Sequence, residues 1–398
     1  MTKTVLISGA SVAGTTLAYW LRRHGFTPTV VERATAVREG GYKIDIRGAA
    51  LDVVERMGVL DAIRAVPTEV RGGTIVTAAG KQVASMDGDT FGGRQRHDAE
   101  ILRGDLTRIL HEAATDGVEY LWGDSIATMT EASDGVTVTF ASGSTRTFDL
   151  VVGADGLHSH TRALAFGPEE RFVHDLGHRV AIYSVPNDLG LDRWEMTYVA
   201  PRRTTLTYAT ARDTGAKAMF LFTADQADPD RRDREAQVQA LQSAYAQEGW
   251  EVPRLLAAAE TAPDFYFDTL SQVRMEHWST GRVALVGDAA YCASPASGQG
   301  TSLALVGAYV LAGELAAAQG DHFRAFAAYE ERMRPFVDAN QKLGPANVKR
   351  MVLATKGQVR VSMFLLGLLN KLPGKDKIMA KAIEPIHKAA TAISLPTY

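Results

Sequence analysis

The 398-residue sequence has a single cysteine, Cys292, and almost no net charge. One cysteine excludes a disulfide scaffold and fits a reducing compartment. The balance of 43 Lys and Arg against 46 Asp and Glu, a net −3, gives no electrostatic basis for nucleic-acid binding. No apolar run reaches the roughly 18 residues of a membrane span, because Glu314 interrupts the nearest candidate, residues 304–318. We therefore expect a cytoplasmic protein of two or three lobes, without stable membrane insertion.

Periodicity predicts an α/β protein interrupted by a second sheet. Short buried strands that end in glycine turns alternate with amphipathic helices near both ends of the chain. Between residues 180 and 224 the pattern changes to apolar–polar alternation rich in Tyr, Thr and Phe, which is typical of an antiparallel sheet. The predicted elements are strands 5–8, 29–32, 150–153 and 282–287, a hairpin of 136–140 with 147–149, and helices 13–24, 50–65, 103–114, 236–247 and 301–318.

The first strand ends in a glycine-rich turn. Gly9 and Gly14 bracket the start of the first helix, and Glu32 ends the next strand 23 residues after Gly9. A free helix N-terminus can bind a pyrophosphate, and an acid about 20 residues further on can bind a ribose. The spacing favours a dinucleotide site, although Ser11 replaces the middle glycine of the usual motif. An ordinary strand–turn–helix connection is the alternative.

Two later strands also end in a glycine followed by an acid. Asp155-Gly156 follows strand 150–153, and Asp288 follows strand 282–287. Taken alone, each is an ordinary strand-end turn with a helix cap. In this order, and with the first turn, they favour a nucleotide cofactor. The ten histidines form no convincing metal-ligand cluster, so no metal is expected.

This ordered set of motifs resembles the single-component FAD-dependent aromatic monooxygenases, the para-hydroxybenzoate hydroxylase-like group. The tail and some loops look most similar to its tetracycline-inactivating and polyketide-modifying branch. The resemblance implies a Rossmann-like three-layer FAD domain, an inserted antiparallel-sheet substrate domain and a C-terminal helix. The implied segments are 1–71, 99–172 and 277–338 for the FAD domain, 72–98 and 173–276 for the substrate domain, and 339–398 for the bridging helix and tail.

The resemblance also implies an activity and site residues. NADPH or NADH would reduce FAD, and a C4a-hydroperoxyflavin formed with O2 would hydroxylate an aromatic or polyketide-like small molecule, with tetracycline-type compounds among the candidates. Asp45 and Arg47 would pass the flavin ring on its N5 side and are the candidate catalytic residues. The implied FAD-binding residues are Gly9, Ser11, Val12, Ala13, Gly14, Glu32, Arg33, Arg103, Ile126, Asp155, Gly156, Asp288, Pro295, Gly298, Gly300, Thr301 and Ser302.

The substrate is expected between the flavin and the antiparallel sheet. Alternation guarantees that some wall candidates pack the sheet core instead. The sequence departs from the family pattern at Tyr291, where a histidine often stands, and at Val306-Gly307, where relatives often have Glu-Asp. The candidate wall residues are Trp194, Met196, Tyr208, Arg212, Met219, Phe220 and Phe222.

Several alternatives stay open. The protein could transfer hydride through a flavin without inserting oxygen, or bind FAD and a drug without catalysis. It could be a monomer or a homodimer. The last 59 residues hold ten Lys and Arg but only two acids, with apolar residues at helical spacing at 348, 352, 359, 363 and 366. The resemblance favours a helix that bridges both domains, and the alternative is a basic amphipathic helix on a membrane.

Overall fold

The first two strands of the chain pair in the middle of a six-stranded sheet, and the helix between them packs on it. The computed structural model describes residues 3–37, 40–95, 97–224, 229–372 and 375–398. The strand order is β17-β18-β11-β1-β2-β7, and the five strands from β18 to β7 are parallel. The elements of this unit are β1 (Thr4–Ser8), α1 (Val12–Arg23), β2 (Thr27–Glu32), β7 (Glu119–Trp122), β11 (Leu150–Gly153), β17 (Ser279–Thr280) and β18 (Val283–Leu285).

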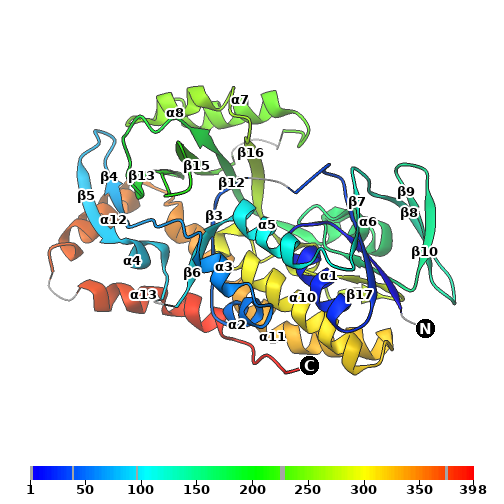
Figure 1. The fold of residues 1–398 in the computed structure, drawn as a ribbon. Coiled ribbons are helices and arrows are strands. Elements are labelled where there is room, and N and C mark those ends of the chain that lie inside the picture. Colours follow the sequence, from blue (N-terminus) through cyan, green and yellow to red (C-terminus); the bar gives the residue numbers. More distant parts are fainter. Residues whose placement is uncertain (1–2, 38–39, 96, 225–228, 373–374) are drawn as a thin grey trace.

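Helices and a small sheet cover the two faces of this parallel sheet. On one face, α1 packs beside α10, and α11 packs on α10 (Figure 1). On the other face, Leu6 and Val31 share an apolar core with Val138 and Phe140 of the three-stranded sheet β10-β9-β8. The covering and connecting elements are α2 (Ala49–Arg56), α3 (Leu60–Arg64), α5 (Arg103–Ala113), β8 (Ile126–Glu131), β9 (Val136–Phe140), β10 (Thr145–Phe148), α6 (His160–Phe166), η1 (Glu169–Arg171), α9 (Asp288–Tyr291), η2 (Pro295–Ser297), α10 (Gly300–Ala317) and α11 (His322–Met351).

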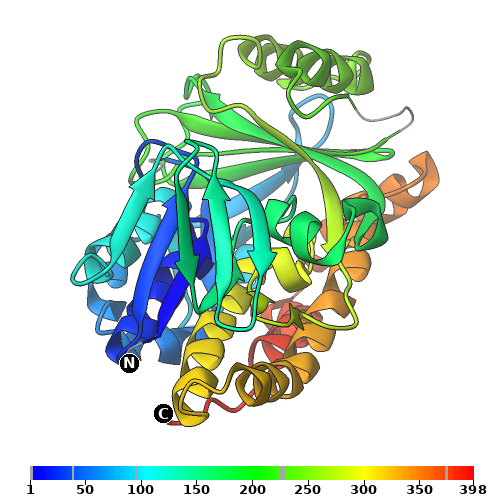
Figure 2. The same ribbon diagram turned by 90° about the vertical axis from the view of Figure 1, so that its right-hand side faces the viewer.

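A seven-stranded sheet forms the second layer system, with the order β16-β12-β15-β14-β13-β4-β5. Two helices, α7 and α8, lie over its outer face (Figure 2). A two-stranded ladder of β3 and β6 runs between this sheet and the first one. These elements are β3 (Lys43–Ile46), β4 (Gly72–Val76), β5 (Gln82–Asp87), α4 (Gly88–Gly92), β6 (Ala99–Leu102), β12 (Val173–Val185), β13 (Trp194–Ala200), β14 (Arg203–Tyr208), β15 (Ala216–Thr223), α7 (Arg234–Tyr245), α8 (Val252–Ala258) and β16 (Tyr266–Val273).

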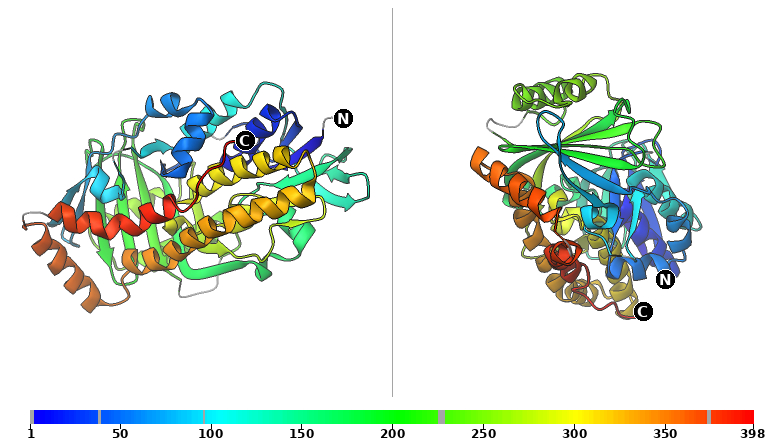
Figure 3. Two further views of the ribbon diagram at one scale, coloured as in Figure 1. Left: turned by 90° about the horizontal axis from the view of Figure 1, so that it is seen from below. Right: turned by 90° about the vertical axis from the view of Figure 1, so that its left-hand side faces the viewer.

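The tail differs from the single continuous helix that its apolar spacing predicts. α11 ends at Met351, and α12 (Lys356–Leu369) continues at 93° to it before α13 (Lys375–Ala390) turns back along the molecule (Figure 3). Thr355 caps α12 with a capping box, which gives the second helix its own start. A similar break divides predicted helix 50–65, because Gly58, at φ +74°, ends α2 before α3 begins.

One described helix, α10, is long and apolar enough to cross a membrane. In the fold 78% of its most apolar stretch is buried, as expected for the core helix of a folded domain. Glu314, the acid within it, is also buried and pairs with Arg332 of α11 at 2.8 Å. The helix therefore serves as the centre of the first domain.

Candidate active site

The glycine-rich turn leaves the N-terminus of α1 open. Gly9 has φ +107°, and a Cβ there would lie 2.7 Å from the Ala154 carbonyl oxygen. A Cβ on Gly14 would lie 1.9 Å from the Gly9 carbonyl oxygen, so α1 sits too close to the turn for any side chain. Ser11 makes no side-chain cap, and the described first turn carries no acid. Its N–H groups are therefore available to an anion. The first helical residues there are Val12 and Ala13.

Glu32 is fixed beside this turn at the carboxyl end of β2. Its two carboxylate oxygens accept the N–H groups of Ala10 and Ala34, both at 2.9 Å. Arg33, the next residue, is exposed. Ile126 begins β8, and its side chain is only 3% exposed in the core between the two sheets. Any ligand contact of Ile126 would therefore have to come from its backbone.

Asp155 organises the loop after β11. Its carboxylate accepts both the N–H and the hydroxyl of Thr161 at 2.9 Å, which fixes the start of α6. Gly156, at φ +84°, faces open space, since a Cβ there would meet no described atom within 4 Å. The fully buried Arg162 donates to the Ala289 carbonyl at 3.0 Å. This bond joins the second strand-end motif to the third.

Asp288 lies where three of the predicted segments meet. A Cβ on Gly300 would be 3.8 Å from its carboxylate, so Asp288 faces the beginning of α10. Burial raises the pKa of Asp288, and a hydrogen bond from Cys292 and the positive charge of Arg103 partly offset that rise. Arg103 also donates to the Ser11 hydroxyl at 3.1 Å. The first and third motifs are therefore linked through Arg103.

The loop before α10 and the first turn of α10 contain buried polar atoms without partners among the described residues. Both amide atoms of the fully buried Gln299 and the hydroxyls of Ser294 and Ser302 have no hydrogen-bond partner among the described residues. Unpaired buried polar groups are costly, and so they mark positions where a ligand can complete the bonding. The neighbouring predicted residues are Pro295 and Gly298, both exposed, and Thr301, which is half-buried.

These features fit FAD. The uncapped start of α1 suits a pyrophosphate, and the unpartnered groups before α10 suit a polar ring system. All three motifs stand at the carboxyl ends of parallel strands, where nucleotide cofactors bind in α/β sheets. Within the described residues, no group of three or more His, Cys, Asp or Glu is placed to hold a metal ion.

A charged strand crosses in front of the loop before α10. Strand alternation brings Lys43, Asp45 and Arg47 to one face of the β3 segment. Arg47 is 3% exposed and pairs with Asp45 at 2.8 Å and with Asp98 at 3.8 Å. It also donates to the Gly298 carbonyl at 3.4 Å. The two candidate catalytic residues are thereby attached to the predicted flavin loop.

This strand belongs to a buried charge network that the sequence analysis did not identify. Lys43 pairs with Glu195 at 2.8 Å and with Glu100 at 3.7 Å, and Glu100 pairs in turn with Arg94. With Arg47, Asp45 and Asp98 included, its buried and half-buried Lys, Arg, Asp and Glu members are three cations and four carboxylates, and the exposed Asp89 also pairs with Arg94 at 3.4 Å. Burial raises the pKa of Asp45, with Arg47 opposing the shift. Alternating charges at 43, 45 and 47 were the only local signal, because the other members come from distant segments.

The seven-stranded sheet divides the predicted wall residues between its two faces. Phe220 and Phe222 pack with Tyr245 in the core under α7 and α8, and Met196 packs against the same core. Trp194 precedes Met196 by two residues on β13 and so points to this face. The two phenylalanines, 0% and 4% exposed, are corrections to the wall set, because the helices enclose them.

The opposite face of the sheet looks toward the charged strand. Tyr208 stands directly opposite Glu195 in the pairing of β13 with β14. Its hydroxyl accepts a hydrogen bond from the backbone N–H of Lys43 at 3.2 Å. Met219 alternates with Phe220 and therefore points to the Tyr208 face. Arg212 lies apart from both faces, 3.5 Å from Asp105 of α5, with its side chain 42% exposed. Of the seven predicted residues, the structure brings Tyr208 and Met219 toward the candidate site.

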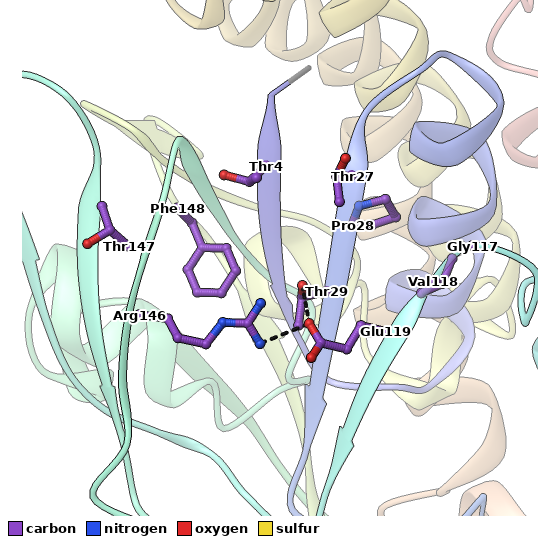
Figure 4. Close-up of a pocket in the computed structure, with 10 residues that line it drawn as sticks. All are labelled: Thr4, Thr27, Pro28, Thr29, Gly117, Val118, Glu119, Arg146, Thr147 and Phe148. Atoms are coloured by element: carbon purple, nitrogen blue, oxygen red, sulfur yellow. Dashed lines mark hydrogen bonds and ion pairs between the residues drawn. The ribbon is translucent and has the colours of Figure 1, made fainter. Parts of the chain in front are cut away.

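A separate hollow of about 440 Å³ lies at the other end of the parallel strands from the three motifs (Figure 4). There Arg146 pairs with Glu119 at 2.8 Å, and Thr29 donates to the same carboxylate at 3.0 Å. This is the amino end of the strands, away from the three motifs. We therefore place the candidate site at the carboxyl edge.

Comparison with known proteins gives a consistent result. The family model described as "FAD binding domain" matches residues 2–342. The chain is 49% identical over 348 residues to an uncharacterized protein of Mycobacterium tuberculosis, covering 87% of this chain and 94% of the relative. It is 41% identical over 340 residues to a flavin-dependent monooxygenase of Legionella longbeachae, covering 85% and 87%.

Solved structures resemble the chain over its whole length. The tetracycline destructase Tet(51) is 36% identical with a TM-score of 0.86, and the two chains cover each other completely. Tet(55) is 39% identical with the same TM-score, covering 100% of this chain and 99% of its own. A Klebsiella pneumoniae HpxO complex with FAD and uric acid, at 21% identity and a TM-score of 0.73, shares the fold.

Proposed function

The chain belongs to the FAD-binding-domain family of para-hydroxybenzoate hydroxylase-like, FAD-dependent monooxygenases, and from this premise we propose that it uses NADPH or NADH and O2 to hydroxylate an aromatic or polyketide-like small molecule. The observation that carries the proposal is the convergence of three strand-end motifs at one sheet edge, in front of the N-termini of α1 and α10. FAD supplies the redox chemistry and the activation of oxygen when it is bound there.

The proposed FAD site is held by residues from all three motifs. The α1 N-terminus after Gly9 binds the pyrophosphate, and Glu32 accepts ribose hydroxyls. Arg103 offers a positive charge between the first and third motifs, where it already reaches the Ser11 hydroxyl. Asp288 faces the start of α10 and binds hydroxyl groups of the cofactor chain. The Gln299 amide completes its bonding with the ligand's polar atoms.

Asp45 and Arg47 are the proposed catalytic residues. Arg47 ties β3 to the loop before α10 through the Gly298 carbonyl, and its pairing with Asp45 fixes that carboxylate. The buried part of the network holds one more carboxylate than cation, and the pKa of Asp45 is raised by burial. We infer that Asp45 holds a proton beside the reacting groups and that Arg47 orients it. The surrounding charges keep the sheet side of Asp45 polar.

The proposed substrate lies between the charged strand and the inner face of the seven-stranded sheet. Met219 is half-buried on this face and offers a thioether to a planar molecule. Tyr208 is fully buried, with the Lys43 ammonium 5.0 Å from its ring centre, and holds the charged strand in place. The two tetracycline destructases support a tetracycline-type or related polyketide substrate. Oxidoreduction without oxygen insertion is the alternative function, and it predicts NADPH consumption without an oxygenated product.

The cofactor site is tested by two aspartates at opposite edges of the same sheet. Asp149 accepts the N–H and hydroxyl of Thr4 at 2.7 and 2.9 Å, at the amino end of β1. Asp288→Ala should therefore release FAD during purification, whereas Asp149→Ala should keep it while unfolding at a lower urea concentration. Absorbance at 450 nm relative to 280 nm measures the flavin. Equal flavin content in the two variants would contradict the assignment of Asp288.

The substrate class is tested by NADPH and NADH oxidation in the presence of tetracyclines, anthraquinones and simple phenols. A true substrate should accelerate oxidation and yield a product heavier by one oxygen atom in mass analysis. Binding without any stimulated oxidation would instead support a non-catalytic drug-binding protein. Purified protein that is colourless and takes up no FAD would refute the whole proposal.

A further inference from the structure

Helix α12 exposes a stripe of large apolar side chains. Val361, Phe364, Leu365 and Leu368 are 59%, 71%, 55% and 49% exposed, and Leu372 just beyond the helix is 45% exposed. These five residues, the apolar stripe, are most of the large apolar side chains that the described part of the chain leaves exposed. None of the residues of α12 is buried. Such a patch usually marks a binding surface.

The stripe is one face of the helix, and the sheet is on the other. Positions 361, 364, 365 and 368 follow the helical repeat and so point the same way. Leu372, in the turn after the helix, lines one hollow together with Leu365 and Leu368. The half-buried Val359, Met363 and Leu366 lie on the opposite side. Gly367 lies on the flank between that side and Arg360, where an added Cβ would be 3.7 Å from the Val83 carbonyl of β5. α12 thus rests on the edge of the seven-stranded sheet and points its stripe outward. Figure 3 shows the helix at the end of the molecule, away from the two termini.

Basic residues border the stripe. Arg360 and Lys371 are both exposed: Arg360 lies on the flank of the helix next to Phe364, and Lys371 lies in the turn that follows the helix. The last 59 residues contain ten Lys and Arg, and one of their two acids, Glu384, pairs with Lys388. An apolar face with a cationic rim complements an anionic lipid surface. A second copy of the chain would instead bring two cationic rims together, which is unfavourable.

We propose that α12 docks the protein on the surface of an anionic phospholipid bilayer. The apolar stripe enters the boundary between headgroups and acyl chains, while Arg360 and Lys371 extend to the phosphates. The edge of the seven-stranded sheet is thereby held at the membrane. The inference does not depend on the proposed chemistry, because docking uses surface residues far from the three motifs.

Vesicle co-sedimentation of the FAD-loaded protein tests the docking. Wild type should sediment with vesicles of phosphatidylcholine and phosphatidylglycerol, bind pure phosphatidylcholine far more weakly, and lose affinity in high salt. Replacing Arg360 and Lys371 together by Gln should weaken binding about 25-fold, at about fivefold per charge. Phe364→Ser with Leu365→Ser should abolish it.

Phe323→Ser is the matched control, because Phe323 is 69% exposed on α11, outside the stripe. It should bind vesicles like wild type. Flavin absorbance and light scattering of each variant show that fold and oligomeric state are kept. Wild type that stays in solution with anionic vesicles would overturn the proposal. So would a wild-type dimer that the Phe364 and Leu365 changes separate, since the stripe would then join two copies.

Discussion

Two departures from the family pattern, Tyr291 and Gly307, depend on each other in the fold. A Cβ on Gly307 would lie 1.9 Å from the Tyr291 hydroxyl, more than 1 Å inside normal contact. Tyr291 is 1% exposed and cannot move outward, and its hydroxyl is 3.0 Å from that of Tyr329. The glycine in α10 therefore provides the space that the tyrosine fills.

Gly307→Ala should lower the free energy of unfolding. Overpacking costs about 1–3 kcal/mol, and displacing the hydroxyl from Tyr329 costs about 1 kcal/mol more. The higher helix propensity of alanine returns about 1 kcal/mol, so the net loss is about 1–3 kcal/mol. Urea unfolding followed by tryptophan fluorescence, in excess FAD, measures it.

Tyr291→Phe should rescue most of that loss. Without the hydroxyl the nearest ring atom would be 3.1 Å from the new Cβ, which a small shift relieves. Tyr329 keeps its bond to the Leu285 carbonyl at 3.1 Å, so the phenylalanine leaves no buried donor unpaired. The double-mutant coupling should be about 2 kcal/mol. Gly357→Ala on α12, where a Cβ meets only Thr355 at 3.8 Å, is the control and should not destabilise. If the effects of the two single changes on the free energy of unfolding add to that of the double change within about 0.5 kcal/mol, Tyr291 and Gly307 do not depend on each other.

Two further variants test the turn and the charge network. Gly14→Ala should lower the free energy of unfolding by more than about 3 kcal/mol and lose FAD, because its Cβ meets the Gly9 oxygen at 1.9 Å. Gly25→Ala is the control: at φ +83° in open space it should cost only about 1–2 kcal/mol and keep FAD. Equal flavin content in the two variants would contradict the role of the turn. Lys43→Met should cost about 3–5 kcal/mol at neutral pH, since it leaves the buried Glu195 short of a cation. Burial lowers the pKa of Lys43, but the nearby carboxylates Glu195 and Glu100 outweigh this effect, and the net pKa is raised above 10.5. Lys43 therefore stays charged below that pH, and its contribution to the free energy of unfolding is fully present there. Urea midpoints from pH 7 to 9, a range in which Lys43 stays charged, should show the same deficit, and a loss under about 1 kcal/mol would contradict the pairing.

Local signals were sufficient for the first strand and the first helix. Predicted strand 5–8 and helix 13–24 correspond to Thr4–Ser8 and Val12–Arg23, because glycine turns and apolar periodicity are properties of neighbouring residues. The family and its mixed α/β fold are confirmed by the match over residues 2–342 and by the destructase structures. The break at Gly58 was missed because a single glycine within an apolar period can also continue a helix.

The rest depended on contacts between distant residues. The sequence showed that successive residues of β15 point to opposite faces of the sheet, but not which face carries the substrate. Phe220 and Met219 therefore looked equally suited to the substrate wall. Only the packing of α7 and α8 decides that Phe220 faces away from the charged strand. Likewise, Lys43 and Glu195 are 152 residues apart, and no local pattern joins them.

Oxygen-isotope labelling tests the central claim most directly. The enzyme, loaded with FAD and supplied with NADPH, is incubated under ¹⁸O2 with the compound that most accelerates NADPH oxidation, and the product is weighed by mass spectrometry. A monooxygenase incorporates one ¹⁸O atom into each product molecule, and Asp45→Asn should lower that yield while FAD stays bound. A product without ¹⁸O, with hydrogen peroxide equal to the NADPH consumed, would contradict the account and leave a flavin oxidoreductase.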